Sequence, residues 1–455
     1  MDIQKSKVKD MTSGPVMSLI LTFMLPLLLG NIFQQTYNIA DSAIVGQTLG
    51  SKALAGVGST SSVQFLVLGF CIGGCTGFAI PVAQCFGAKD YVRMRRYLYH
   101  SYIVGAILSV VVTLLTCLLT PQILHLLSVP SDIYQLSKDY IFIIFLGIPF
   151  TILYNLTSSM LRALGDSKTP FIYLSVSVFM NIFLDLFCIL VLKMGVRGAA
   201  LATIASQGVS GFLCAFYIHR KMEIMHIAKE EKKLSKDYFG KLMVMGLPMG
   251  LQFSITAIGS MIMQSANNSL GSVYVSGFTA GYKIKQFALC PFDALSAAVS
   301  TFVGQNLGAR KIDRIKKGFT QSIFVGMGYG IVMGTIMFFG GRYLSLLFVS
   351  SKETAVINAS AQYQAWLGVM FWVLGILNVA RMTLQGLGRT GLAIFSGVME
   401  MIARTFVSFV FTPIYGFNAI CCADQAAWCL ASLYVFPMAL YVMKKIEREF
   451  EGSLA

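Results

Sequence analysis

Long apolar runs separated by short polar segments fill the chain from residue 15 to residue 444. Each run has roughly 20 residues or more, the length that an α-helix needs to cross the hydrocarbon core of a membrane. The pattern predicts an all-α polytopic membrane protein, because helices satisfy their own backbone hydrogen bonds in lipid. The twelve predicted transmembrane helices are residues 15–46, 53–84, 94–119, 133–163, 168–192, 195–218, 241–268, 273–306, 318–341, 354–386, 390–414 and 421–444.

The placement of basic residues gives these helices an orientation. The chain has 35 Lys and Arg residues against 20 Asp and Glu, a formal net charge of +15. Most of the basic residues fall in segments on the same side as the N-terminus, and few lie on the opposite side. This positive-inside pattern predicts that both termini are cytoplasmic, and it explains the net charge without a nucleic-acid partner. The ten cysteines and four histidines show no metal-ligand spacing, so we expect no metal site and no cofactor.

The second half of the chain repeats the first. "AQCFGAKDYVRMRRYLYHSYIVG" (83–105) aligns with "GQNLGARKIDRIKKGFTQSIFVG" (304–326), and "LRALG" (161–165) aligns with "LQGLG" (384–388). Six helices per half is an even number, so both halves have the same orientation. Parallel repeats of this kind predict two six-helix lobes related by a pseudo-twofold axis along the membrane normal, with a cavity at their interface.

The repeat also predicts the domain organisation. Residues 1–218 form an N-lobe, residues 219–240 a cytoplasmic linker between the lobes, and residues 241–455 a C-lobe with a cytoplasmic tail. The linker is the longest polar segment of the chain, and its alternating charges suggest a solvated or interfacial helix.

Acidic residues lie within two of the apolar runs. Asp41 lies on one broad helical face with other polar residues, and a second polar series, spaced by four residues, leads along the fifth helix to Asp185. Such faces must contact protein or water rather than lipid. The residues on the first face are Asn31, Gln34, Gln35, Tyr37, Asn38 and Asp41, and those of the second series are Ser177, Asn181 and Asp185.

Two carboxylates in one poorly hydrated pocket cannot easily both carry a charge, so Asp41 and Asp185 predict a proton-binding site in the N-lobe. The same oxygens, with Asn181, Thr203 and backbone carbonyls, could instead hold Na⁺. A third interpretation is that each carboxylate only joins helices by hydrogen bonds.

The second repeat has no acid at the corresponding places. By simple alignment Asp41 matches Ile262 and Asp185 matches Ser408. Glu400 and Arg404 instead form an i, i+4 pair that can neutralise itself. We therefore expect a titratable N-lobe and a self-paired C-lobe, in which Glu400 and Arg404 have a structural role.

A further set of residues is expected to line the substrate cavity. It combines polar residues within the helices with a methionine, a flexible side chain that suits an adaptable wall, although packing alone also explains a methionine there. The set is Gln34, Asn38, Asn155, Met261, Gln264 and Lys283. Lys285 and Asp293 lie in the same predicted helix as Lys283. The two lysines could extend to the membrane surface or line the aqueous cavity and tune its potential, and the sequence does not decide between these roles.

Together these features resemble the MATE (multidrug and toxic compound extrusion) family over nearly the whole chain. The resemblance rests on the "VAQCFGA" and "VGQNLGA" pair and, most specifically, on "MNIFLDLFCILVLKMGVRGAALAT" (180–203). It implies a V-shaped pair of lobes with rocker-switch alternating access. It also implies that Tyr37, Asp41, Asn181, Asp185 and Thr203 are ion-coupling residues, as in the DinF-type prokaryotic branch. The acids of the seventh and tenth helices in the NorM-type branch are missing.

The resemblance implies a secondary transporter rather than an enzyme. We expect a monomeric antiporter in a bacterial inner membrane that exports amphipathic, often cationic, compounds against an inward flow of H⁺ or, less favoured, Na⁺. Its partners would be small organic substrates and membrane lipid. A flippase for lipid-linked precursors of related fold and a membrane-embedded transferase are alternatives. Against the transferase, the sequence shows no His–Asp pair or acidic metal motif near a membrane face.

Overall fold

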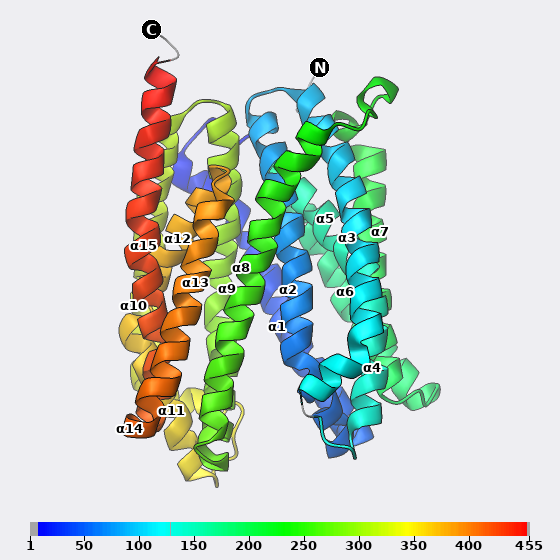
Figure 1. Cartoon of the computed structure of the whole chain (residues 1–455), viewed down its shortest axis with the longest axis vertical. Helices are drawn as coiled ribbons and strands as arrows, with labels where there is room; N and C mark the ends of the chain where they lie inside the picture. The colour runs from blue at the N-terminus through cyan, green and yellow to red at the C-terminus, as the bar shows by residue number, and fades with distance from the viewer. Residues whose placement is uncertain (1–7, 128, 453–455) are drawn as a thin grey trace. The chain divides into compact units, whose positions relative to one another are not determined.

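The computed structural model describes residues 8–127 and 129–452. Within them the regular structure is helical (Figure 1). The α-helices are α1 (Val16–Leu49), α2 (Ser51–Gly87), α3 (Tyr91–Leu126), α4 (Tyr134–Leu146), α5 (Ile148–Ala163), α6 (Lys168–Leu186), α7 (Val196–Lys221), α8 (Lys236–Asn268), α9 (Ser272–Gly308), α10 (Ile312–Ser345), α11 (Thr354–Met370), α12 (Val373–Gly386), α13 (Thr390–Phe406), α14 (Thr412–Tyr415) and α15 (Phe417–Gly452). Short turns are the π-helical η2 (Phe187–Val191) and η5 (Val407–Phe411) and the 3₁₀ turns η3 (Glu223–Met225) and η4 (Lys229–Glu231).

The membrane-spanning segments match the twelve predicted runs. In the described part of the chain, ten segments are long and apolar enough to cross a membrane, and two bent helix pairs bring the number to twelve. The fourth and tenth segments differ from the prediction of continuous helices. The first pair, α4 and α5, bends by 44°, and the second, α11 and α12, bends by 60°.

The break between α4 and α5 has a local cause. Pro149 follows Gly147 in the first turn of α5, where a proline is tolerated but cannot continue a preceding helix. Gly147 also packs directly against α7, since a Cβ atom there would lie 2.1 Å from Cγ2 of Ile204. The proline is visible in the sequence. The need for glycine at position 147 is not, because it comes from contact with a helix more than 50 residues away in the chain.

The chain folds into two compact units. Unit 1 contains residues up to Asp10 and Leu29–Gly250, and unit 2 contains Met11–Leu28 and Leu251 onward. The boundaries fall inside α1 and α8, two or three residues after Pro26 and Pro248. Each of these helices therefore contributes to both units.

Small residues let the helices of unit 1 approach closely. A Cβ on Gly77 of α2 would lie 2.6 Å from the Cα of Gly246 in α8. Close backbone contact of this kind supports helix association in membranes, where the hydrophobic effect between helices is weak. The buried core of the unit includes Cys71, Cys75, Phe145 and Met160, each completely inaccessible to solvent.

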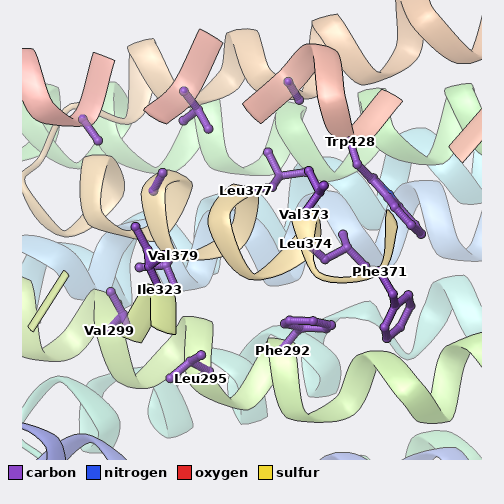
Figure 2. Packing of buried hydrophobic residues seen from close by; sticks show 14 of the residues in the cluster. Phe292, Leu295, Val299, Ile323, Phe371, Val373, Leu374, Leu377, Val379 and Trp428 are labelled. Carbon is purple, nitrogen blue, oxygen red and sulfur yellow. The ribbon is translucent and has the colours of Figure 1, made fainter. Parts of the chain in front are cut away.

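Aromatic and branched side chains fill unit 2 (Figure 2). Phe292 of α9 packs edge-on against Phe371, with ring centroids 5.4 Å apart, and Phe371 packs in the same way against Trp428 of α15 at 6.0 Å. These T-shaped contacts fix α9, the α11–α12 break and α15 against one another.

The two units repeat the same backbone irregularities. Lys89 and Arg310 both have positive φ angles, of 59° and 55°, although neither is glycine. Each ends a turn between two long helices at the same place in its repeat. Among the described residues, eight of the ten with positive φ form pairs along the chain, namely Gly50 and Gly271, Lys89 and Arg310, Gly165 and Gly388, and Gly195 and Gly416, while Gly14 and Lys193 have no counterpart. The duplication read from the sequence is therefore present in the fold of each unit.

The polar segment between α7 and α8 is not the helix that its charges suggested. It forms the turns η3 and η4 and is held on α3 of unit 1. Arg95 of α3 donates two hydrogen bonds from Nε and Nη2 to the carboxylate of Glu231, at 2.8 and 2.6 Å. The backbone N–H of Ser235 donates to Nε2 of His100 at 2.9 Å. These contacts hold the linker on α3.

Candidate functional site

Two acidic residues from separate helices meet inside unit 1. Phe33 of α1 stacks on Phe171 of α6 at 5.9 Å, and Gly30 leaves room for Leu174, so the second half of α1 lies against α6. This packing brings the Asp41 and Asp185 carboxyl groups into direct interaction. Asp185 is completely buried and Asp41 is 8% exposed.

The polar series on α6 faces inward. Ser177, Asn181 and Asp185 are all buried, whereas Phe179 and Phe183 between them are 67% and 66% exposed. This is the reverse of a soluble helix and suits a segment whose outer face meets lipid. Ser177 donates a hydrogen bond to the carbonyl of Ser206 on α7 at 2.6 Å, which orients the series toward α7.

Tyr37 and Thr203 join α1 to α7 beside the acid pair. Their hydroxyl oxygens lie 3.1 Å apart, and the Thr203 hydroxyl also donates to the carbonyl of Ala199 at 3.1 Å. Because that carbonyl uses the Thr203 proton, the Tyr37 hydroxyl is the donor to Thr203. The five residues that the resemblance implies for ion coupling therefore come from α1, α6 and α7 of one unit.

Two further residues of the site were not found by sequence reasoning. Tyr140 of α4 is 4% exposed and interacts electrostatically with both Asp41 and Asp185. Its hydroxyl also forms a hydrogen bond with Gln64 of α2. A single tyrosine in the apolar run "DYIFIIFL" carries no periodic signal, and only the packing of α4 shows its place.

The arrangement leaves polar atoms that protein groups do not satisfy. Among the described residues, both polar side-chain atoms of Asn181 are buried without a hydrogen-bond partner, and both carboxyl oxygens of Asp185 and Oδ1 of Asp41 have none outside the acid pair itself. Buried polar groups normally have partners, so these atoms fit a site that takes up a proton or a small cation. Oxygen and amide ligands of this kind suit Na⁺ as well as a shared proton.

A π-helical turn begins two residues after Asp185 and corrects the internal alignment. The turn η5 begins 220 residues after η2, whereas Gly388 lies 223 residues after Gly165. α13 has 17 residues where α6 has 19, so the shift changes within this helix. Asp185 therefore corresponds to Thr405 rather than to Ser408. The second repeat still has no acid there.

The residues expected to line a substrate cavity are divided between the units. Asn155 donates to the carbonyl of Thr151 at 2.8 Å, and Gln264 donates to Asn268 at 2.9 Å. Lys283 is exposed, with its ammonium group 5.8 Å from the centre of the Phe348 ring. The exposed members are Gln34, Asn38 and Lys283, and the half-buried ones are Asn155, Met261 and Gln264.

Unit 2 holds a buried ionic network where a simple ion pair was expected. Arg404 Nη2 lies 3.3 Å from Glu400 Oε2, but its Nε donates to Asp424 of α15 at 3.0 Å. Asp424 is completely buried and also accepts hydrogen bonds from Lys285 at 2.5 Å and from the Tyr363 hydroxyl at 2.9 Å. The pair is thus not self-contained, and Asp424 is an acid that the sequence reading overlooked.

Arg381 completes this network. Its Nη2 contacts Glu400 Oε1, and its Nε donates to the Ser396 hydroxyl at 2.8 Å. Glu400 is therefore shared by Arg381 and Arg404. The tenth predicted helix does lack an acid, but the arginine in it pairs with an acid of the next helix. We call Lys285, Arg381, Glu400, Arg404 and Asp424 the unit 2 ionic network.

Comparison with known proteins places both repeats in one family. The MatE family model matches the chain twice, at residues 26–187 and 248–414, together more than half of its length. The chain belongs to the MatE family. The two matches begin at Pro26 and Pro248, which lie just before the two unit boundaries.

Relatives and solved structures agree with this assignment. The chain is 30% identical over 417 residues to a probable multidrug resistance protein, YpnP, of Bacillus subtilis, covering 90% of each chain. It is 27% identical over 435 residues to a second such protein of that organism, YoeA, covering 93% of each. An outward-facing structure of a MATE family multidrug resistance transporter superposes with a TM-score of 0.91 at 19% identity, covering 97% of this chain and 99% of that one. The fold is the twelve-span, two-lobe MATE fold.

Proposed function

We propose that this MatE protein is a cation-coupled multidrug efflux antiporter, driven by H⁺ rather than Na⁺. It would lie in a bacterial plasma membrane with both termini in the cytoplasm, as the distribution of basic residues indicates. The substrates would be amphipathic, often cationic, organic compounds. The multidrug resistance names of the relatives from Bacillus subtilis support this class.

The contact of Asp41 with Asp185 carries the proposal. A buried pair of carboxyls in direct interaction is stable when the two share a proton, because two adjacent charges in a poorly solvated site repel each other. The empty hydrogen-bonding capacity of Asn181 can serve either protonation state, because an amide both donates and accepts.

Coupling follows from linkage between the proton and the substrate. If protonation of the acid pair weakens substrate binding by some factor, bound substrate must weaken proton binding at the acid pair by the same factor. Tyr37 and Asp41 are one helical turn apart on α1, so a change at the acid pair acts on the helix that contains Pro26. A proline inside a helix lacks one backbone hydrogen bond and is a natural place for bending. Alternating access of the two lobes by a rocker-switch motion is part of the proposal.

Reconstituted liposomes test this function. Efflux of a fluorescent organic cation is measured with a proton gradient alone and then with a sodium gradient alone. Wild-type protein should respond to the proton gradient, and Asp41→Asn and Asp185→Asn should each lower the initial rate about tenfold or more. Asp132→Asn is the matched control because Asp132 is exposed. Full efflux by both site variants would refute the mechanism. A response to the sodium gradient alone would show that Na⁺, and not H⁺, is the coupling ion. Movement of a fluorescent lipid-linked sugar instead of the cation would favour a flippase.

A further inference from the structure

The unit 2 ionic network contains more positive than negative groups. Among the described residues it joins three basic side chains, Lys285, Arg381 and Arg404, to two carboxylates, Glu400 and Asp424. Every one of the five is at most 8% exposed. An uncompensated charge is expensive in a buried, poorly polarisable environment. The network is therefore one negative charge short of neutral.

The ammonium group of Lys285 already has a negatively charged partner. It lies 2.5 Å from Asp424 Oδ2 and 3.5 Å from the Tyr363 hydroxyl. It also lies over the rings of Tyr282 and Trp428, at 5.2 and 5.8 Å from their centres. A carboxylate together with two aromatic faces stabilises the charged form of an amine. The Lys285 charge thus faces a carboxylate and two rings, which offset part of the cost of its burial.

The unmatched donor belongs to Arg404. Its Nε donates to Asp424 and its Nη2 faces Glu400, but within residues 8–127 and 129–452 its Nη1 has no hydrogen-bond partner. Arg404 is 4% exposed, so this N–H group is shielded from solvent. Glu400 cannot supply a further charge because Arg381 binds its other oxygen. The surplus charge and the unsatisfied donor therefore coincide at one guanidinium.

We propose that unit 2 contains a binding site for a single monovalent anion at Nη1 of Arg404. The ligand chemistry is one negative charge with an acceptor atom, as in chloride or in the carboxylate of an organic molecule. Its charge would neutralise the network, and its acceptor would satisfy the remaining N–H. Because Nη1 is shielded in this structure, the anion would enter when α8, whose Gly259 lies against the Arg404 side chain, moves away. This site does not depend on the proposed coupling at Asp41 and Asp185.

The test measures anion binding to purified full-length protein in detergent. Chloride and acetate are each titrated against isethionate at constant ionic strength, and the melting temperature and the binding of ³⁶Cl⁻ are recorded. Wild-type protein should show saturable stabilisation, since a ligand that binds only the folded state raises its stability. Stabilisation by both anions, by chloride alone or by acetate alone supports the site and identifies its class of ligand. No saturable effect of either anion overturns the proposal.

Paired variants change the surplus charge in opposite directions. Lys285→Met makes the network neutral and should weaken anion binding about tenfold or more, whereas Glu400→Gln raises the surplus to two and should tighten it. Lys283→Met, two residues away on α9 and exposed, should bind like the wild type. Tighter anion binding by Glu400→Gln cannot result from unfolding. The Glu400→Gln result therefore stays informative if Lys285→Met fails to fold. Equal anion affinity in Lys285→Met and the wild type contradicts the proposal. So does a stability that varies with pH but not with the anion, because the network would then lose a proton instead.

Discussion

The hydroxyl groups of Tyr37 and Thr203 lie 3.1 Å apart, although 166 positions separate them in the chain. The contact joins α1 to α7 at the acid pair. Hydrogen bonds within a protein contribute about 0.5–1.5 kcal/mol net, so a double-mutant cycle can detect this one. We expect Tyr37→Phe and Thr203→Val to show a coupling energy of about 1 kcal/mol in the free energy of unfolding. Strict additivity of the two changes would mean that the hydroxyls do not interact.

The interface of α4–α5 with α7 should be sensitive to a single methyl group. Gly147→Ala places a Cβ against Ile204, and overpacking of this kind costs about 1–3 kcal/mol in the free energy of unfolding. Adding Ile204→Ala should recover part of the loss because it removes the colliding atoms. The control is Gly58→Ala, where a Cβ would meet nothing within 4 Å. Thermal melting in detergent measures all four proteins, and an unchanged Gly147→Ala variant would contradict the close packing.

Lys89 should tolerate glycine better than a branched residue. Its φ of 59° lies in the left-handed region, which costs a residue with a Cβ about 1 kcal/mol. The side chain is exposed, so its loss removes little packing. We expect Lys89→Gly to match or exceed the wild-type melting temperature, and Lys89→Val to fall below it. The reverse order would show that the turn adopts another conformation.

Acid should release the linker from α3. The hydrogen bonds from Arg95 hold the pKa of the Glu231 carboxyl below its usual range. A carboxyl whose pKa is lowered by folding contributes its stabilisation above its unfolded pKa of about 4.3. That contribution is lost as the pH falls through the lower, folded value. The protection of residues 222–235 against hydrogen exchange, taken relative to the intrinsic exchange rate at each pH, should therefore fall below about pH 4 in the wild type.

Two variants provide the comparison for this acid effect. Glu231→Gln should exchange faster at neutral pH already and lose the pH step, because it cannot form the charged contact with Arg95. Glu230→Gln is the neighbouring control, since Glu230 is exposed. A pH step of unchanged size in Glu231→Gln would assign the effect to another group.

The number and approximate places of the spans could be predicted from the sequence because lipid requires long apolar runs. The inward series of Ser177, Asn181 and Asp185 could be predicted because its period is that of a helix. The place of Asp424 could not be read in this way. It is a single acid in "CCADQAAW", and its partners come from three other helices. Tyr140 was missed for the same reason. A polar residue whose partners are all distant in sequence has no local pattern.

The breaks in the fourth and tenth spans show another limit. Proline occurs inside continuous helices at Pro26, Pro81, Pro248 and Pro291 as well as at the α4–α5 break. The residue alone therefore does not distinguish a bend from a break. Whether the span bends or breaks depends on the helix packed against that position, as Ile204 of α7 is packed against Gly147.

The division of α1 and α8 between the units has a consequence for the ancestry of the chain. Each repeat begins with a helix whose first part belongs to one unit and whose remainder belongs to the other. A gene that encoded a single repeat would produce a protomer unable to complete its own core. Its first helix would be exchanged with that of a second protomer, as in a domain-swapped homodimer. Fusion of two such genes would have made the exchange internal, after which the two halves were free to acquire different buried charges, a carboxyl pair in one half and an arginine-rich network in the other.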